Sequence, residues 1–182
     1  MEITLEQIKE LREKTGAGVL SCKNALIETN GDTKKAIEFL KEKGFSVANT
    51  KLLRSTKEGV ISPYIHTGAK ICVLLELNCE TDFVARRIEF QNLAKNLAMQ
   101  IAAFQDIKYI SIEKIPQDVW DLEQKFESNK NKILDKLKMY TLLNQIYILD
   151  SKITVEEHIK NHIYLLGENI QINRFSKFII GD

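Results

Sequence analysis

Cysteine is scarce in this sequence, and its few residues have no spacing that suggests a bridge or a metal site. Cys22, Cys72 and Cys79 are an odd set without a CxxC pair. This pattern disfavours paired disulfides and a cysteine zinc site, and it favours a reducing compartment. We therefore expect the fold to depend on its apolar core, without a metal, a cofactor or a disulfide.

Long apolar runs are also absent. No stretch approaches the ~20 residues that cross a bilayer, so no membrane span is expected. The N-terminal segment, MEITLEQIKELREK, has helical spacing and mixed charge. It lacks the apolar region of a signal peptide and the acid-poor pattern of a transit peptide. We therefore expect the protein to work in the compartment in which it is made.

The sequence has no excess of charge of one sign. Lys and Arg total 26, Asp and Glu total 25, and the formal net charge is +1. A near-neutral chain disfavours a broad surface for polyanions, although a local basic patch is compatible with these totals. Nucleic acid is therefore not an expected partner.

The sequence does contain enough apolar residues for a sizeable core. Hydrophobic residues make up 44% of its 182 positions and charged residues 28%, which is typical of a soluble globular protein. A chain of this length buries roughly 70% of the surface that its unfolded state exposes. The length suits one ordinary domain, or a small domain joined to a larger one.

The first part of the chain, residues 1–45, predicts a three-helix module. Thr4 and Gln7 form a capping-box pattern, and the glycines of TGAG at 15–18 and NGD at 30–32 separate the helices. The third helix is expected to stop near Gly44. The residues expected to form the small core recur at helical spacing: Leu5, Ile8, Leu11, Val19, Cys22, Leu26, Ala36, Ile37 and Leu40.

Residues 46–57 have weak periodicity and are predicted to be a linker, and residues 58–182 then change to a different pattern. Residues 60–66 and 69–78 predict a β-hairpin, in which Pro63 places the first strand at a sheet edge because proline cannot donate a ladder hydrogen bond. The tail after Gly167 predicts a last strand. The expected fold class is α+β: a helical module followed by a core domain with a small antiparallel sheet packed by helices.

Three helices are predicted within this core domain. Apolar residues from Val84 to Ile101 predict one helix of about five turns. A charged helix is expected from Pro116 to about Leu137, with Phe126, Leu134 and Leu137 as its apolar contacts. A second capping box at Thr154 and Glu157 predicts a short helix near residue 155.

Motifs for bond-making chemistry are missing. GAGVLS lacks the third glycine of a dinucleotide fingerprint and follows no strand, and there is no phosphate-binding loop. His158 and His162 are four residues apart on a predicted helix, but no third metal ligand accompanies them. Cys79 has only His66 as a candidate base, so a buried structural cysteine is the preferred interpretation. The protein is not expected to be an enzyme.

The stretch NCETDFVAR at 78–86 leaves two interpretations open. In the first, Thr81 or Asp82 caps a helix and Phe83 packs locally over the hairpin. In the second, the cap makes the joint rigid, and Phe83 projects outward as an anchor for a partner's pocket. Composition does not decide between them.

Three separate blocks of the sequence resemble the elongation factor Ts family of bacteria and organelles. They are LREKTGAGVLSCKNAL at 11–26, HTGAKICVLLELNCETDFVAR at 66–86 and GENIQINRF at 167–175. They occur in the family's order and extend over nearly the whole chain. The amino-acid sequence of the second block is most similar to that of the cyanobacterial and plastid branch. The resemblance therefore favours the plastid stroma as the location, with a bacterial cytoplasm as the alternative.

The resemblance implies a guanine-nucleotide exchange factor that binds GDP-bound elongation factor Tu. In this family a phenylalanine enters between two helices of Tu, disturbs its magnesium site and promotes GDP release. The resemblance places this role on Phe83, with Asp82 beside it and Thr81 and Val84 flanking the pair. It also implies a second contact through the N-terminal module, which is similar to ubiquitin-associated domains. The residues implied in that contact are Arg12, Val19, Leu20 and Lys23.

The sequence departs from the family pattern in two places. Val19, Leu20 and Ser21 stand where many members have Met-Met-Asp. The region 125–140 is shorter than in relatives, and the dimerisation insertion of the longest members is missing, so a homodimer stays open.

The competing hypothesis is a non-catalytic adaptor built on the module that resembles ubiquitin-associated domains.

Overall fold

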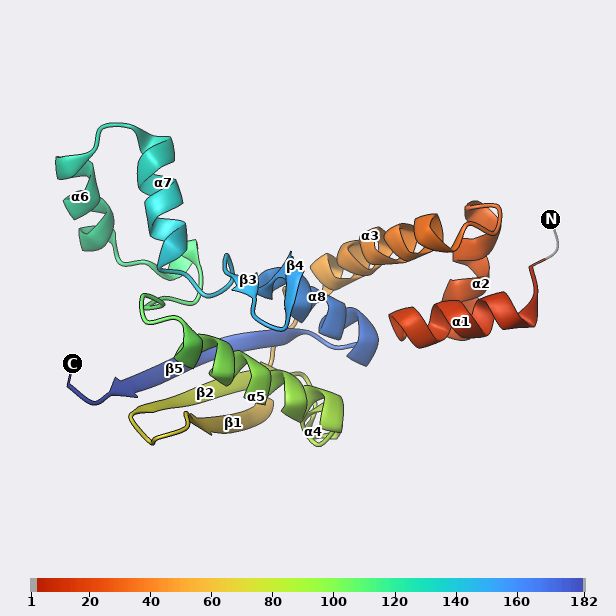
Figure 1. Cartoon of the computed structure of the whole chain (residues 1–182), viewed down its shortest axis with the longest axis horizontal. Coiled ribbons are helices and arrows are strands. Elements are labelled where there is room, and N and C mark those ends of the chain that lie inside the picture. Colours follow the sequence, from red (N-terminus) through yellow and green to blue (C-terminus); the bar gives the residue numbers. More distant parts are fainter. Residues whose placement is uncertain (1–2, 182) are drawn as a thin grey trace. The chain divides into compact units, whose positions relative to one another are not determined.

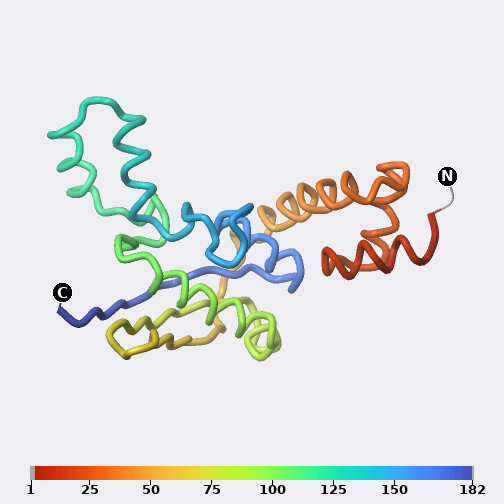
Figure 2. Tube along the Cα trace, in the orientation of Figure 1, coloured from red at the N-terminus to blue at the C-terminus, as the bar shows by residue number. Residues whose placement is uncertain are grey.

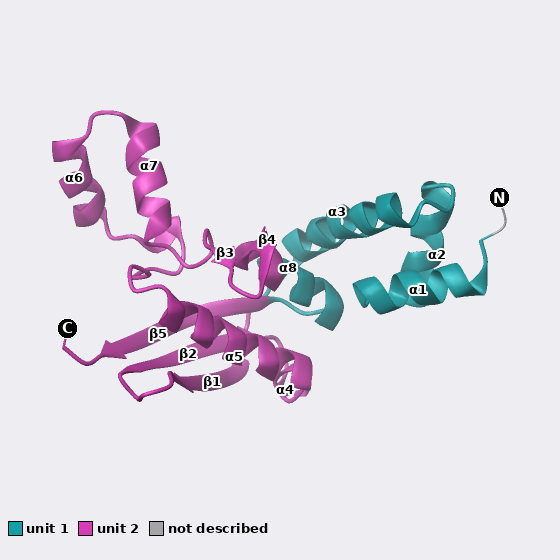
Figure 3. Ribbon diagram, viewed as in Figure 1, with its two compact units in different colours: residues 1–54, 160–169 teal, residues 55–159, 170–182 magenta. Residues whose placement is uncertain are grey.

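The computed structural model describes residues 3–181 and contains two compact units (Figure 3). Unit 1 comprises Met1–Arg54 and Lys160–Asn169, and unit 2 comprises Ser55–Ile159 and Ile170–Asp182. The division predicted from the sequence, 1–45, 46–57 and 58–182, stays a prediction. No helix among the described residues is long and apolar enough to span a membrane.

Unit 1 begins with the three expected helices, α1 (Leu5–Thr15), α2 (Val19–Glu28) and α3 (Thr33–Lys51). Both hydrogen bonds of the predicted capping box are present at the start of α1. Gly16 ends this helix with φ 67°, a left-handed conformation that glycine adopts without strain. The buried residues of this core are Ile8, Leu11, Ala17, Cys22, Ala25, Leu26, Ala36 and Leu40. Leu5 is 85% exposed, so its expected place in this core is wrong.

Helix α3 is longer than predicted, because Gly44 does not end it. Its buried residues Ala36, Leu40, Gly44 and Ala48 recur every four positions and form one continuous stripe. A Cβ atom on Gly44 would lie 3.3 Å from the ring of Tyr164, so this glycine permits a close helix contact. The expectation of a stop near Gly44 is wrong, and the first residues of the predicted linker are helical.

The second half of helix α8 (Val155–Leu166) packs against these helices within unit 1. Tyr164 contacts their apolar core. Beyond the helix, the buried Asn169 amide donates hydrogen bonds to the carbonyls of Leu52 (3.2 Å) and Arg54 (2.7 Å). These bonds fix the chain where α3 ends. The predicted capping box at Thr154 and Glu157 is confirmed at the start of α8.

Unit 2 is built on a three-stranded antiparallel sheet in the order β1-β2-β5 (Figure 1). The strands are β1 (Glu58–Ile65), β2 (Ile71–Cys79) and β5 (Ile170–Ile179). The predicted hairpin and last strand are confirmed, and Pro63 lies on an edge strand. Figure 2 shows the chain reversing between β1 and β2 and returning as β5.

Helix α5 (Ile88–Ala103) covers one face of this sheet (Figure 1). Alternate residues of β2, among them Val73, Leu75 and Leu77, are fully buried on that face, as the strict alternation in the sequence predicts. The opposite face carries exposed apolar residues. Unit 2 therefore has one covered sheet face and one open face.

The single long helix predicted from Val84 to Ile101 is wrong, since the chain forms α4 (Asp82–Ala85) and then α5. Arg87 adopts an extended conformation, with φ −69° and ψ 138°, and becomes the N-cap of α5. Its guanidinium donates two hydrogen bonds to Glu89, at 3.2 and 2.7 Å, which raises the pKa of Arg87. This break separates the corner at Thr81 from the helix that covers the sheet.

The middle of unit 2 contains a 3-10 turn (Ile112–Lys114), α6 (Gln117–Phe126) and α7 (Lys130–Met139). The predicted single helix to Leu137 is interrupted because the Asn129 side chain accepts hydrogen bonds from two backbone amides and starts α7. Leu137 is buried as expected, but Phe126 is 81% exposed. A short pair, β3 (Ile146–Tyr147) and β4 (Asp150–Thr154), leads to α8.

Candidate protein-binding site

The corner between β2 and α4 is organised around Thr81. This residue has an extended backbone and is the N-cap of α4. Its hydroxyl accepts a hydrogen bond from the Val84 amide (3.5 Å), and its carbonyl accepts one from the Ala85 amide (3.2 Å). The thiol of Cys79, the last residue of β2, donates to the same carbonyl (3.1 Å). The corner is therefore tied to the strand on one side and to the helix on the other.

Phe83 points away from the protein interior at this corner. Its exposed fraction is 79%, whereas that of the next residue, Val84, is 6%. The buried side chain of Val84 attaches the short helix to the core, whereas the neighbouring Phe83 ring is exposed. Local packing of Phe83 over the hairpin, the first interpretation, is therefore wrong for this structure.

Asp82 starts helix α4 and pairs with Arg86 one turn later. The carboxylate and the guanidinium are 2.7 Å apart, with side-chain exposures of 44% and 78%. An exposed pair of this kind contributes little to stability, so its carboxylate stays accessible to a partner at small cost. Thr81, and not Asp82, is the residue that caps the helix.

The four residues expected to contact a partner from the N-terminal module all lie on the surface of unit 1. Val19 and Leu20, in the first turn of α2, are 56% and 69% exposed. Arg12, in the last turn of α1, and Lys23, one turn further along α2, are also exposed. Val19 therefore does not share the buried face of Cys22, and the prediction that it belongs to the module's core is wrong.

The sequence-predicted site residues fall into two surfaces, one in each unit. Thr81, Asp82, Phe83 and Val84 form one turn in unit 2, and the other four belong to unit 1. Ile88 is a further exposed apolar residue near this turn, although it falls within the apolar repeat that predicts a helix from Val84 to Ile101. This residue is 63% exposed in the first turn of α5, and its position in the apolar repeat concealed that.

The histidines and cysteines do not form a reactive centre in the described part of the chain. The His158 ring stacks on Tyr147, with ring centroids 3.9 Å apart, and burial raises the pKa of Tyr147. Residues 3–181 contain no group of three or more His, Cys, Asp or Glu residues that could hold a metal. His66 lies at the opposite end of the β-hairpin from Cys79, so these two cannot act as base and nucleophile.

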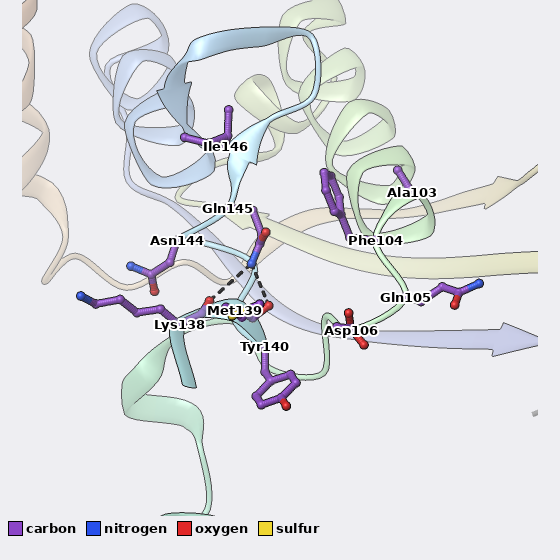
Figure 4. A pocket seen from close by; sticks show the side chains of 10 residues that line it. All are labelled: Ala103, Phe104, Gln105, Asp106, Lys138, Met139, Tyr140, Asn144, Gln145 and Ile146. Atoms are coloured by element: carbon purple, nitrogen blue, oxygen red, sulfur yellow. Dashed lines mark hydrogen bonds between the residues drawn. The ribbon is translucent and has the colours of Figure 1, made fainter. Parts of the chain in front are cut away.

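A pocket of about 620 Å³ in unit 2 lies away from the corner (Figure 4). Figure 4 shows the Gln145 side chain at its centre. The Gln145 amide donates hydrogen bonds to the carbonyls of Met139 (2.9 Å) and Lys138 (3.4 Å), so it serves the chain's own backbone. No nucleophile and base pair lines this pocket, and none of the predicted site residues does.

Comparisons with known proteins agree over the whole chain. The family model described as "Elongation factor TS" matches residues 7–182. The chain is 49% identical to "Elongation factor Ts, chloroplastic" of Guillardia theta, and the match covers 100% of this chain and 90% of the relative. The corresponding protein of Rhodomonas salina is 48% identical over the same shares.

Cyanobacterial proteins match to a similar extent. "Elongation factor Ts" of Picosynechococcus is 46% identical, again over 100% of this chain and 90% of the relative. That alignment extends over 197 positions, more than the 182 residues of this chain, so the relative contains residues without a counterpart here. The shortening of the region 125–140 stays a prediction.

Proposed function

The chain belongs to the elongation factor Ts family, and on this basis we propose that the turn Thr81–Val84 is the part that acts on elongation factor Tu. The family consists of translation elongation factors, and its general function is guanine-nucleotide exchange. This chain is therefore a translation elongation factor that interacts with Tu and promotes the replacement of GDP by GTP. The finer proposal is that it binds the GDP-bound state of Tu.

The exposure of Phe83 is the single observation that carries the proposal. A phenylalanine with 79% of its surface in water adds little to folding, yet it can bury a large apolar area against a partner. Phe83 belongs to a capped turn, and the residue that follows it, Val84, is buried. The Phe83 ring therefore loses little conformational freedom when it binds a partner. In the proposed complex the ring enters between two helices of Tu and disturbs the magnesium site.

Exchange by this route requires no bond chemistry in the factor. The factor stabilises a state of Tu that holds GDP and magnesium poorly, and the coupling between the two ligands is reciprocal. Each ~1.4 kcal/mol removed from the barrier to GDP release accelerates it about tenfold. A buried aromatic anchor contributes roughly 2–4 kcal/mol, so Phe83 supplies only part of a large acceleration.

The exposed residues of unit 1 are the proposed second contact. Val19 and Leu20 offer apolar area at the start of α2, and Arg12 and Lys23 supply positive charge on the same module. Two contacts on one chain raise the effective concentration of the second after the first has formed. We assign binding strength mainly to this surface and the disturbance of the nucleotide site mainly to Phe83.

The test of the proposed function is the release of a fluorescent GDP from elongation factor Tu. The labelled complex is mixed with excess unlabelled GDP, with and without this protein at micromolar concentration. The proposal predicts a large acceleration that saturates with the concentration of the factor. Binding to Tu without any acceleration would support the competing hypothesis, a non-catalytic adaptor.

The near-even charge of the chain supports the further proposal that nucleic acid takes no part.

The open face of the sheet supports a separate proposal, a homodimer. Ile61, Leu74 and Phe178 on this face are 66%, 42% and 62% exposed, and they come from three neighbouring strands. Two such faces can stack about 10 Å apart as a sandwich.

The plastid stroma is the proposed location, with a bacterial cytoplasm as the alternative. The chloroplastic proteins of Guillardia theta and Rhodomonas salina and the cyanobacterial relatives support it. Fractionation of the source cells would test it. The proposal predicts that the protein accompanies stromal enzymes, and its recovery only outside plastids would contradict that.

A further inference from the structure

We propose that Cys79 is a positioning residue for nucleotide exchange, whose buried thiol fixes the Thr81 carbonyl and thereby the backbone that carries Phe83. The inference rests on the proposed role of Phe83. It gives a function to a cysteine that the chemistry of the site does not otherwise use.

The geometry of the corner supports this assignment. Cys79 is fully buried at the end of β2, and its Sγ lies 3.1 Å from the Thr81 carbonyl oxygen, a short distance for a thiol donor. The same oxygen accepts the Ala85 amide, which is the first backbone hydrogen bond of α4. The thiol therefore acts on the atom that starts the helix, and only Glu80 separates the strand from the cap.

The direction of the Phe83 ring depends on this backbone, because the side chain itself is buried very little. Phe83 is 79% exposed, so side-chain packing fixes the direction of its ring only weakly. The helix that carries it has 4 residues, and its backbone hydrogen bonds from Ala85 and Arg86 go to the oxygens of Thr81 and Asp82. A shift of the Thr81 carbonyl therefore moves the ring directly. Misplacement of an acting group by about 1 Å can slow a reaction greatly.

Two roles of the cysteine make opposite predictions for substitution. If Cys79 only fills apolar space, alanine should be tolerated better than serine, because a buried hydroxyl carries a desolvation cost. If the donor to Thr81 matters, serine should be tolerated better than alanine, because its hydroxyl can still donate to the carbonyl. The comparison of Cys79→Ala with Cys79→Ser thus separates the two roles.

The experiment measures Tu-bound GDP release at increasing concentrations of each full-length variant. We expect Cys79→Ala to lower the maximal release rate roughly 2- to 10-fold, the effect of one modest hydrogen bond. The concentration for half-maximal effect should change little, because the surface of unit 1 is untouched. Cys79→Ser should recover most of the rate. Cys72→Ala is the matched control, since Cys72 lies on the same strand but alternates to the other face.

A double-mutant cycle with Phe83→Ala decides whether the thiol acts through the ring. We expect Cys79→Ala to have no further effect on the maximal rate once Phe83 is removed. An equal loss in both backgrounds, or an alanine variant better than serine, would overturn the inference. If Phe83→Ala itself leaves release unchanged, the proposed function fails and the inference with it. If only the Cys79 variants lack an effect, the inference alone fails.

Discussion

Replacing Phe83 with alanine should separate function from folding. The side chain is 79% exposed, so its removal takes little apolar contact from the folded protein. Surface substitutions of this kind change stability by about 0.5 kcal/mol or less. At the interface the same ring is expected to contribute roughly 2–4 kcal/mol, so its loss should slow stimulated GDP release about 30- to 1,000-fold.

The assay combines stopped-flow GDP release with thermal unfolding of the free factor. Phe126→Ala is a matched control, because Phe126 is also a largely exposed phenylalanine of unit 2 but lies on α6. We expect the control to release GDP at the wild-type rate, and both variants to melt within a few degrees of wild type. A Phe83 variant that melts far lower but still stimulates release normally would refute the reasoning.

Three further predictions concern the other surfaces. Lys23→Ala should raise the concentration of factor needed for half-maximal GDP release severalfold at low salt, and the difference should shrink in high salt, because salt screens an exposed charge. Hydrogen bonds from Asn173 (2.8 Å) and Arg174 (2.7 Å) lower the pKa of Glu76 below its ordinary 4.5. The stabilisation from these bonds is present above the unfolded-state pKa of Glu76 and is lost as the pH falls through its folded-state pKa. Glu76→Gln should therefore lose less stability at acid pH than the wild type, measured as the free energy of unfolding against pH. Phe178→Glu should turn a homodimer into a monomer in light scattering coupled to size exclusion, and an unchanged mass at equal concentration would count against the open sheet face as the interface.

Local signals in the sequence were sufficient for much of unit 2. Strict alternation along β2, a turn rich in small residues and a proline that can only lie at an edge predict the hairpin correctly. The capping boxes at Thr154 in unit 2 and Thr4 in unit 1 mark helix starts correctly, because both partners of a capping box are only three residues apart.

Contacts between distant segments explain the misplaced end of α3. Gly44 resembles a helix stop until Tyr164, far along the chain, is seen to pack against it. Asn169 similarly holds the end of α3 through two carbonyls that no local pattern identifies. Information of this kind lies in tertiary packing, which overrides the local preference of a glycine or a loop.

The candidate site shows a different limit. Val19 and Phe83 are apolar, and periodicity treats an apolar residue as core whether it faces the interior or a partner. The sequence left the direction of Phe83 open, and only the exposed fraction decides it. The family resemblance identified the residues to examine, but the rigidity of the turn, including the thiol of Cys79, becomes visible only in the hydrogen bonds.

The most direct measurement is the environment of the Phe83 ring in the presence of elongation factor Tu. 4-Fluorophenylalanine placed at position 83 reports burial through its fluorine resonance, with the same label at position 126 as the comparison. We predict that adding GDP-bound Tu shifts the resonance at 83, that excess GDP and magnesium reverse the shift, and that the signal at 126 does not move. An unchanged resonance at 83, under conditions in which the labelled factor still accelerates GDP release, would contradict the proposed role of Phe83.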